Sequence, residues 1–406
     1  DTTPKTATFS AVSGNGYFCN TSGGAFTVNL PAGAAGAIVS VADYAATWQT
    51  NNLTVSPNGS EKIGSAAGDA TLSTEGQSVT FVYVDSTQGW INTMDSTSNV
   101  RGATFTVATG GTILTCGNYK IHVFTGPGTF CVSSIGNCAP NGRPSNADYT
   151  VVAGGGGSNY GAGGAGGFRN SVTCAGVIPL SVSGFPITVG SGGAGTPSGC
   201  AARGSNSIFS SITSTGGGAS GDCTGSPSVP STLAPGGSGA GGPGTDFPAP
   251  SPGSPAATDP QIGGVGNTPP VSPPQGNPGG SGHGTYGSPD NGSGGGGGAG
   301  AAGANTTIGV SAGTPGGAGA PTSIFGSTPT APSYGESGPS PGRYFAGGGA
   351  GTQQTPGAKT GGVGGGGDAP GASGTGTNGL TNMGGGGGDR RGSGGSGIVI
   401  IRYKFQ

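Results

Sequence analysis

Long glycine tracts are the feature that most constrains what this chain can fold into. Nineteen of its 98 glycines precede residue 154 and none follows Gly397, which leaves 79 in the 244 residues between. Glycine loses more backbone entropy on ordering than other residues and has no side chain to bury. An ordered fold must therefore rely on backbone hydrogen bonds and close packing. The main tracts are Gly154–Gly157, Gly161–Gly167, Gly236–Gly244, Gly294–Gly303, Gly361–Gly371 and Gly384–Gly397.

Composition narrows the alternatives for the whole chain. Hydrophobic residues make up 31% and charged residues 7%, both well below the values of a typical soluble domain, so one large side-chain core is not expected. Collagen is excluded because it requires glycine at every third position, and residues 294–298 are five consecutive glycines. The same composition is typical of disordered chains, and disorder is the alternative to an ordered glycine fold.

Polyglycine II is the ordered structure that best suits such tracts. This extended left-handed helix has three residues per turn and no internal hydrogen bonds, so every buried N–H and C=O needs an outside partner. Neighbouring glycine helices can be those partners, because without Cβ atoms their backbones approach closely. We predict packed polyglycine II helices with interspersed strands over residues 154–397. Irregular glycine loops on a β scaffold and a silk-like or solenoid sheet are the alternatives.

The first 96 residues follow a different pattern, with short alternating runs separated by Gly, Pro and Asn. Runs such as Ala37 to Val41 and Ser78 to Val84 predict a small antiparallel β-sandwich or barrel. Trp48 and Trp90 are the only tryptophans, and we expect both in its core. The polar stretch 95–102 predicts a linker.

Residues 97–153 are interpreted as a linker and a β-hairpin scaffold, with the hairpin turn at Gly126–Gly128. In that register Cys116 and Cys138 would lie opposite each other, which makes them a candidate disulfide. Residues 398–406 are interpreted as a closing strand, and we expect it to pair with the Lys120–Ala153 sheet. The fold class is thus mainly β with essentially no α-helix.

Signals of enzymatic chemistry are thin, and we predict no catalytic residues, no cofactor and no metal site. His122 alternates within an expected strand and His283 lies between glycines, so both are interpreted as structural or surface residues. The seven cysteines include no Cys-x-x-Cys. Acidic residues are scattered singly, although a carboxylate pair assembled in space would still permit a depolymerase. The net charge of -2 and the short aliphatic run Ile398–Ile401 predict neither nucleic-acid binding nor membrane insertion.

Several strings resemble the glycine-rich domains of bacteriophage tail fibres and adhesins, with a form closest to those of cyanophages and other marine phages. They are ATGGTILTCGNYKIHVFTGPGTFCVSS (Ala108 to Ser134), DYTVVAGGGG (Asp148 to Gly157), GGAGGFR (Gly163 to Arg169), FPITVGSGGAG (Phe185 to Gly195), GSNSIFSSITSTGGG (Gly204 to Gly218) and GGSGIVIIRY (Gly394 to Tyr403). Near the N-terminus, GYFCNTSGGAFTVNLP (Gly16 to Pro31) and GQSVTFVYVDSTQGW (Gly76 to Trp90) are similar to a β module common in tail fibres. The resemblance implies an extracellular virion protein that binds a host receptor, either a glycan or an outer-membrane protein. It also implies contacts with other tail or virion proteins, and trimeric packing is common in such fibres.

Recognition is expected at the loops of the glycine-rich region, because the interior of a polyglycine lattice tolerates little but glycine. Large side chains that interrupt the tracts should lie at the lattice ends, and aromatic and charged residues dominate binding hot spots. Packing against the β scaffold is the alternative for several, above all Phe168 and Phe345. A purely structural fibre, a capsid decoration protein and a secreted bacterial surface filament are the alternative functions. The receptor-binding candidates are Tyr160, Phe247, Tyr286, Tyr334, Tyr344, Phe345, Asp389, Arg390 and Arg391.

Overall fold

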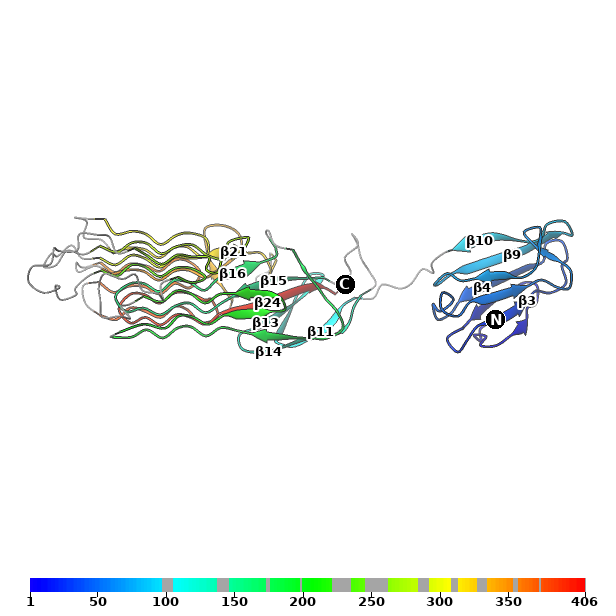
Figure 1. The fold of residues 1–406 in the computed structure, drawn as a ribbon, viewed down its shortest axis with the longest axis horizontal. Coiled ribbons are helices and arrows are strands. Elements are labelled where there is room, and N and C mark those ends of the chain that lie inside the picture. Colours follow the sequence, from blue (N-terminus) through cyan, green and yellow to red (C-terminus); the bar gives the residue numbers. More distant parts are fainter. Residues whose placement is uncertain are drawn as a thin grey trace, which may run out of the picture. The chain divides into compact units, whose positions relative to one another are not determined.

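The computed structural model divides the chain into two compact units, Asp1–Gly102 and Ala103–Gln406 (Figure 1). Both are built from strands and extended segments, and the described residues contain no α-helix, as predicted. The structure describes residues 1–96, 105–136, 146–172, 176–197, 199–220, 235–244, 262–283, 292–307, 313–326, 334–352, 357–371 and 374–405.

The N-terminal unit is a sandwich of two β-sheets. Trp48 and Trp90 are both fully buried in its core, as predicted, and Trp90 Nε1 donates to Glu61 Oε2 at 3.1 Å. One sheet has the order β1 (Phe9–Ser10), β3 (Phe26–Asn29), β5 (Leu53–Ser56), β8 (Ala70–Leu72). The other has the order β2 (Asn15–Cys19), β4 (Ile38–Asp43), β9 (Ser78–Asp85), β10 (Gly89–Ser96), β6 (Lys62–Ile63), β7 (Ala66–Ala67).

The expectation of purely antiparallel pairing in this unit is wrong. β1 pairs with β3, β3 with β5 and β2 with β4 in parallel. The reason is that β1 to β5 alternate between the two sheets, so neighbours within a sheet are two strands apart along the chain and run the same way. The expected linker also begins later, because Asp95 and Ser96 are the last residues of β10.

The second unit is organised around a central sheet whose middle strand is the C-terminal β24. As predicted, β24 pairs antiparallel with strands of the Lys120–Ala153 region, with Ile400 opposite both Val123 and Thr150. The central sheet has the order β12 (Thr112–Cys116), β13 (Tyr119–Phe124), β24 (Ile398–Lys404), β15 (Asn146–Val152), β16 (Phe168–Asn170), and β17 (Ile178–Pro179) pairs with β15. A second sheet has the order β11 (Val107–Thr109), β14 (Gly128–Ser134), β18 (Gly184–Thr188), β19 (Ser207–Phe209), β20 (Ile212–Ser214), and a third has β21 (Ala320–Thr322), β23 (Arg343–Phe345), β22 (Glu336–Ser337).

Both faces of the central sheet are covered, which explains the uninterrupted aliphatic run of β24. Val399 and Ile401 belong to one hydrophobic cluster, with Phe130 and Phe209 of the second sheet. Ile398 and Ile400 belong to another, with Ile324, Phe325 and Phe345. A strand buried on both faces has no polar side to show as an alternation.

The predicted hairpin at Gly126–Gly128 is wrong, because β13 and β14 belong to different sheets. β13 is paired on one edge with β12 and on the other with β24, which leaves no edge for β14. Phe130 and Val132 of β14 instead reach the shared core from the opposite sheet. The turn therefore passes from one layer of the sandwich to the other.

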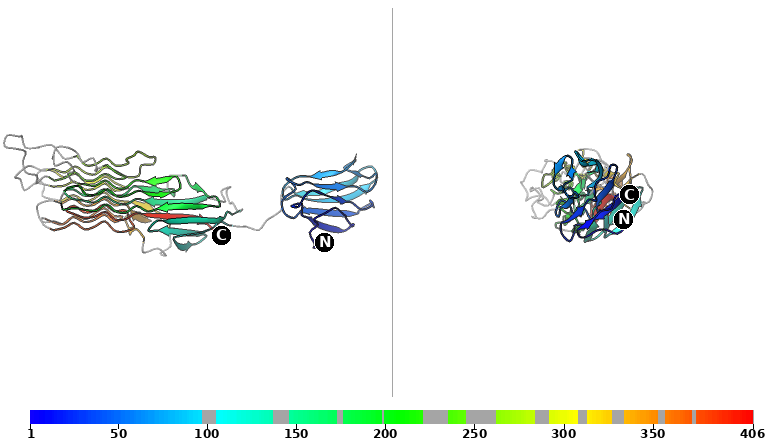
Figure 2. Two further views of the ribbon diagram at one scale, coloured as in Figure 1. Left: turned by 60° about the horizontal axis from the view of Figure 1, so that its bottom comes forward. Right: turned by 90° about the vertical axis from the view of Figure 1, so that its right-hand side faces the viewer.

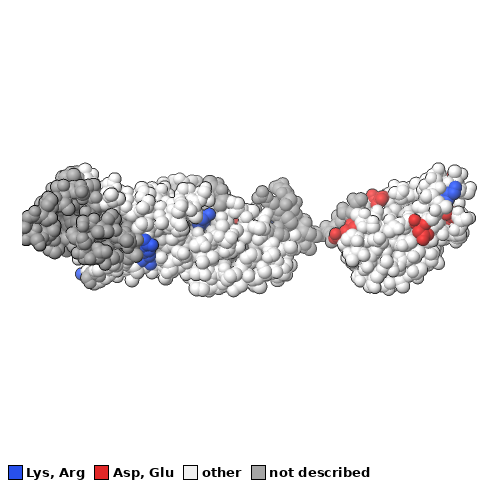
Figure 3. All heavy atoms as spheres, viewed as in Figure 1, with Lys and Arg blue, Asp and Glu red and all other residues white. Residues whose placement is uncertain are grey.

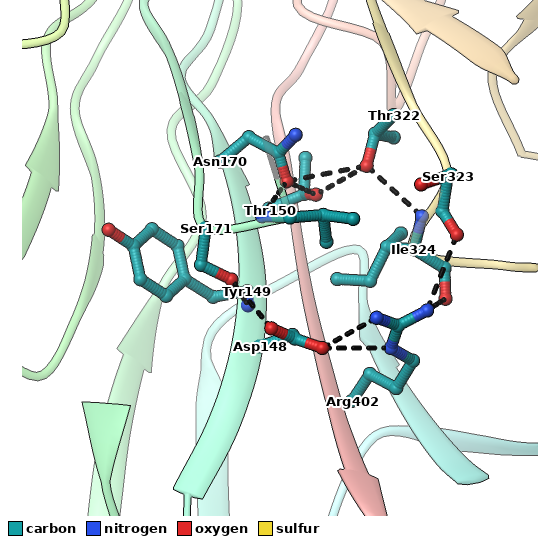
Figure 4. Close-up of polar contacts among 10 residues, drawn as sticks. Asp148, Tyr149, Thr150, Asn170, Ser171, Thr322, Ser323, Ile324 and Arg402 are labelled. Atoms are coloured by element: carbon teal, nitrogen blue, oxygen red, sulfur yellow. Dashed lines mark hydrogen bonds and ion pairs between the residues drawn. The ribbon is translucent and has the colours of Figure 1, made fainter. Parts of the chain in front are cut away.

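A polar network ties the segment after β21 to the central sheet (Figure 4). Arg402 on β24 donates to Asp148 Oδ2 through Nε at 3.1 Å and Nη2 at 2.5 Å. Its Nη1 reaches the carbonyl oxygen of Ile324 at 3.3 Å. Nearby, the hydroxyls of Thr150 and Thr322 lie 3.1 Å apart in a hydrogen bond. These bonds cross from β15 and β24 to β21 and so fix the third sheet against the central one.

The tract at residues 154–159 shows how the glycine region is packed. Gly154 and Gly157 donate to one neighbouring tract, and Gly155 and Ser158 donate to a second, so the partner repeats every third residue. The carbonyl oxygens of residues 154–159 accept hydrogen bonds with the same three-residue repeat. This is the polyglycine II arrangement that we predicted, with three residues per turn and every polar group directed outward. The six surrounding tracts are 161–167, 191–196, 202–205, 216–220, 384–390 and 392–395.

Neighbouring carbonyl groups leave no room for a side chain at Gly155 or Gly156, although alanines such as Ala162 and Ala165 are fully buried at other positions of the lattice. A Cβ built on Gly155 would fall on the carbonyl oxygen of Gly385, and one on Gly156 would fall on that of Gly218. In glycine an α-hydrogen points in this direction instead, so that weak Cα–H···O contacts reinforce the N–H···O bonds. The tracts are therefore held together by backbone on all sides.

The tracts run away from the sheets and turn back at their far end (Figure 2). From β15 the chain passes along 154–159, turns at Tyr160 and returns along 161–167 to β16. Near the C-terminus it passes along 384–389, turns at Arg390 and Arg391, and returns along 392–397 to β24. We call this far end of the lattice the turn end.

Candidate functional site: the turn end of the glycine lattice

Four polar side chains are buried at the turn end, which we call the polar clasp. They are Ser158, Asn159, Ser220 and Asp389, and each is no more than 3% exposed. Ser158 and Asp389 directly follow a glycine tract, and Asn159 and Ser220 follow one after a single intervening residue, at the point where the chain leaves the lattice. Burial of such groups requires hydrogen-bond partners, and the neighbouring turns provide them.

Asn159 joins three separate turns. Its Nδ2 donates to the carbonyl oxygen of Gly199 at 2.6 Å, and its backbone N donates to Ser220 Oγ at 3.1 Å. Its carbonyl oxygen accepts from the backbone N of Arg390 at 3.2 Å. One residue earlier, Ser158 Oγ donates to the carbonyl oxygen of Gly388 at 2.5 Å. The clasp thus holds turns together that are up to 234 residues apart in the sequence.

Asp389 holds the turn at Arg390 and Arg391 in place. Its Oδ2 accepts from Ser293 Oγ at 2.5 Å, Thr352 Oγ1 at 2.5 Å and the Thr352 backbone N at 3.2 Å. Its Oδ1 accepts from the backbone N of Arg390 at 2.6 Å. Four donors from the protein therefore satisfy this buried carboxylate, which faces inward rather than toward a ligand.

Next to the polar clasp, the turn end has one aromatic and two basic side chains that are exposed or half-buried. Tyr160 is 40% exposed, Arg391 is exposed and Arg390 is half-buried. Both arginines lie in the left-handed backbone region, with φ of 63° and 79°. This region is unfavourable for residues with a Cβ, so the surrounding bonds must hold the turn in place.

The structure brings together only some of the predicted recognition residues. Tyr160, Arg390 and Arg391 are neighbours at the turn end, whereas Asp389 belongs to the buried clasp. Phe247 and Tyr286 lie outside the described residues.

The remaining aromatic candidates lie at the scaffold and do not offer a receptor surface. Tyr344 and Phe345 lie on β23, where the tract 347–351 begins at the sheets, and they are only 5% and 0% exposed, so the expectation that they are accessible to a receptor is wrong. Tyr334 is half-buried and stacks on Phe325 with the ring centroids 6.1 Å apart. Phe168 on β16 is buried in the same hydrophobic cluster as Phe345. These rings are needed by the fold because the third sheet packs on the central sheet through them.

The predicted disulfide rested on a register that the structure does not have. Cys116 lies on β12 opposite Tyr119, and Cys138 lies outside the described residues. Cys200, beside Gly199 at the turn end, is disulfide-bonded. Cys19 is fully buried, and its burial, followed by the negative charge of Asp43, raises the pKa of this thiol to about 12.

The two histidines serve the fold. His122 is fully buried, its Nδ1 lies 2.7 Å from the carbonyl oxygen of Gly110, and burial lowers its pKa. His283, expected at the surface, is only 7% exposed, because its backbone pairs with Gly292 on the adjacent tract.

Among the described residues, no three His, Cys, Asp or Glu residues are grouped so as to hold a metal ion. Nor do those residues include any helix with the length and apolar character to span a bilayer.

Sequence reasoning missed the polar clasp. Ser158, Asn159 and Ser220 were passed over because serine and asparagine in a glycine-rich chain look like ordinary loop residues. The available signal was their position, since each occurs where a glycine tract ends. Ser293 and Thr352, the partners of Asp389, flank tracts in the same way.

In comparison with known protein families, a family described as a glycine-rich domain matches residues 125–404, which is most of the chain and runs from β14 through the lattice to β24. No curated protein was found to match the chain.

Proposed function

This chain belongs to the glycine-rich domain family, and we propose that it is a bacteriophage tail-fibre adhesin that attaches to the host cell surface through the turn end. The proposal takes the phage assignment from the resemblance of its β motifs and the place of recognition from its geometry. Its location would be the virion, outside the host cell.

The observation that supports the proposal best is that backbone groups hold the tracts together, while exposed side chains at the turns remain accessible to a ligand. The tracts bond to one another through the backbone, whereas the side chains of Tyr160 and Arg391 at the turns are exposed. Turns from distant parts of the sequence gather at one end and are pinned there by Asn159 and Asp389. Variable side chains on a rigid scaffold are the usual basis of recognition by loops.

An antibody against residues 103–406 tests this proposal on intact particles. Labelling at the tips of tail fibres, together with inhibition of host attachment by its Fab fragment, is the expected result. Labelling of the capsid without inhibition would establish a decoration protein instead. Labelling of fibres without inhibition would favour a purely structural fibre, and labelling of uninfected bacteria would identify a surface filament.

A further inference from the structure

We infer that Asn58 is a modification site, at which the side-chain amide is lost through a succinimide to give aspartate and isoaspartate. The chain contains five Asn-Gly pairs, and three of them lie entirely within the described residues: Asn15-Gly16, Asn58-Gly59 and Asn378-Gly379. The fold engages the reacting groups of the first and third pairs but not those of the second. The site belongs to the N-terminal unit and is independent of the proposed function.

The reaction needs only water and the groups of the pair itself. The backbone N of the glycine loses its proton and attacks the carbon of the asparagine amide, so that a new C–N bond closes a five-membered succinimide. The bond from that carbon to Nδ2 breaks, and the nitrogen takes up a proton and leaves as ammonia. Water then opens the ring at one of its two carbonyl carbons, which gives aspartate or isoaspartate. Glycine favours the attack because it has no Cβ and is conformationally free.

Asn58-Gly59 lies in the turn between β5 and β6, and both residues are exposed. Gly59 has φ of 57°, and a Cβ built on it would meet no atom within 4 Å. The turn is closed by a bond from Glu61 N to the Asn58 carbonyl oxygen at 3.0 Å, which uses neither reacting group. Among the described residues, none accepts a hydrogen bond from the Gly59 nitrogen or bonds to the Asn58 amide. The nitrogen can therefore approach the amide carbon without breaking a bond of the fold.

Asn378-Gly379 lies on a glycine tract and is the matched comparison. The Gly379 nitrogen donates to the carbonyl oxygen of Ser393 at 2.8 Å, and Asn378 Oδ1 accepts from the Ser393 nitrogen at 2.8 Å. The neighbouring tract thus holds both the attacking nitrogen and the amide. Ring closure here must first break these two hydrogen bonds.

Asn15-Gly16 is protected in a different way, because it lies within β2. Asn15 pairs with Val39 and Gly16 with Ser40 in the parallel ladder with β4. The Asn15 amide also reaches the Tyr17 hydroxyl, with Nδ2 and Oη 3.4 Å apart. Ring closure requires the main chain of the asparagine to leave the extended conformation, and strand pairing opposes that rotation.

Both products add a negative charge to an acidic unit. Residues 1–96 include seven Asp and Glu against two Lys, and acidic side chains stand out on the N-terminal unit in Figure 3. The added charge separates modified chains from unmodified ones on an anion exchanger, so that they can be enriched for measurement.

Isoaspartate would also disturb the core of this unit. It adds one carbon to the main chain and moves the Asn58 carbonyl out of the backbone, so that the bond from Glu61 N is lost. The Glu61 carboxylate accepts from the Gly33 nitrogen at 2.8 Å and from Nε1 of the buried Trp90 at 3.1 Å. A change in the turn therefore reaches a core tryptophan.

Ageing of the purified full chain at pH 8 and 37 °C tests the inference, with peptide mass mapping to follow each pair. In the native protein Asn58 should deamidate at least about tenfold faster than Asn378 or Asn15, since ring closure at those pairs must break bonds of the fold. In concentrated urea the rates of the three pairs should agree within about threefold. Equal rates in the native protein, or an Asn58 that stays unmodified, would overturn the inference.

The matched control is Asn58→Gln, because the longer side chain would have to close a less favourable six-membered ring. Both tryptophans lie in the N-terminal unit, so unfolding monitored by tryptophan fluorescence reports on this unit alone. The aged, enriched parent should unfold at a lower urea concentration than the fresh parent, and the aged variant should not change. An equal shift in the variant, or no shift in chains that carry isoaspartate at position 58, would overturn the link from this turn to Trp90.

Discussion

Replacing Gly155 by alanine tests whether backbone packing holds the glycine-rich unit together. Gly155 lies in the tract with six neighbours, donates to the carbonyl oxygen of Gly395 at 2.9 Å and accepts from the backbone N of Gly193 at 2.9 Å. An added Cβ would fall on the carbonyl oxygen of Gly385 and within 2.9 Å of the Gly386 nitrogen. Because those atoms are backbone, a rotamer change cannot relieve the clash.

The expected destabilisation follows from these contacts. Overpacking in a close-packed interior typically costs about 1–3 kcal/mol. Moving the tracts apart would also weaken at least three backbone bonds, including that from Gly395 N to Gly385 O at 2.8 Å, at about 1 kcal/mol each. The sum of roughly 4–6 kcal/mol is a large part of the stability of most domains. We expect a markedly lower unfolding temperature of the second unit, or failure of that unit to fold.

Calorimetry combined with tryptophan fluorescence can assign the loss to one unit. Both tryptophans, Trp48 and Trp90, belong to the N-terminal unit, so the fluorescence transition should not move. The second unit has no tryptophan, so its unfolding is seen only by calorimetry, and the midpoint temperature of that transition should fall by roughly 10 °C, or the transition should disappear. Gly176→Ala is the matched control, because a Cβ there meets no atom within 4 Å, and it should change stability by less than about 0.5 kcal/mol. Equal effects of the two variants would refute backbone packing as the source of stability.

Four further outcomes are expected. Burial lowers the pKa of His122, so as the pH falls the unfolded state takes up a proton on this side chain before the folded state does. The free energy of unfolding should therefore be constant above about pH 6.5 and fall by up to about 1.4 kcal/mol per pH unit below it. Urea unfolding of the parent and of His122→Gln at several pH values should show a weaker dependence of this free energy on pH in the variant. Asp389→Ala leaves buried donors without an acceptor and should lower the free energy of unfolding by about 3 kcal/mol. The control Asp368→Ala removes an exposed carboxylate and should lower it by less than about 1 kcal/mol. Similar losses for the two variants in denaturant unfolding would argue against a stabilising role of the polar clasp. Removal of residues 398–406 exposes the edges of β13 and β15 and should yield insoluble protein, and a soluble, folded truncation would contradict the central place of β24. Iodoacetamide at pH 8 should label the exposed Cys131 and spare Cys19, whose thiol is buried with a pKa of about 12, a difference that peptide mass mapping can measure.

Composition predicted the mode of packing in the glycine-rich region, provided that the region is ordered. A segment with so many glycines has few side chains to bury, so the backbone groups must bind one another. The three-residue period of the hydrogen bonds around residues 154–159 follows from that requirement and from the absence of Cβ atoms. The buried tryptophans of the N-terminal unit and the pairing of the C-terminal strand were also predicted, because large apolar side chains and aliphatic runs have few alternatives to a core.

Strand pairing was predicted less well, since local patterns do not show which edge is occupied. A glycine-rich turn between two apolar runs indicates a reversal of the chain, but not whether the second run joins the same sheet. At Gly126–Gly128 the answer depended on β24, which enters from the far end of the sequence and takes the edge of β13. The parallel pairs of the N-terminal unit arise in the same way, from strands that are not consecutive.

The arrangement of side chains at the turn end depended on tertiary structure more than any other feature of the protein. The sequence determined that large side chains between glycine tracts lie where the lattice is interrupted, but an interruption can be a turn or an entry into a sheet. Tyr160 lies at a turn, while Phe345 lies on β23 and is fully buried. Which turns meet, and which polar side chains join them, depends on the order in which the tracts pack. Asp389 bonds to Ser293 across 96 residues of sequence because the tracts that carry these residues pack at the same end of the lattice, and that arrangement is a property of the whole lattice rather than of any tract.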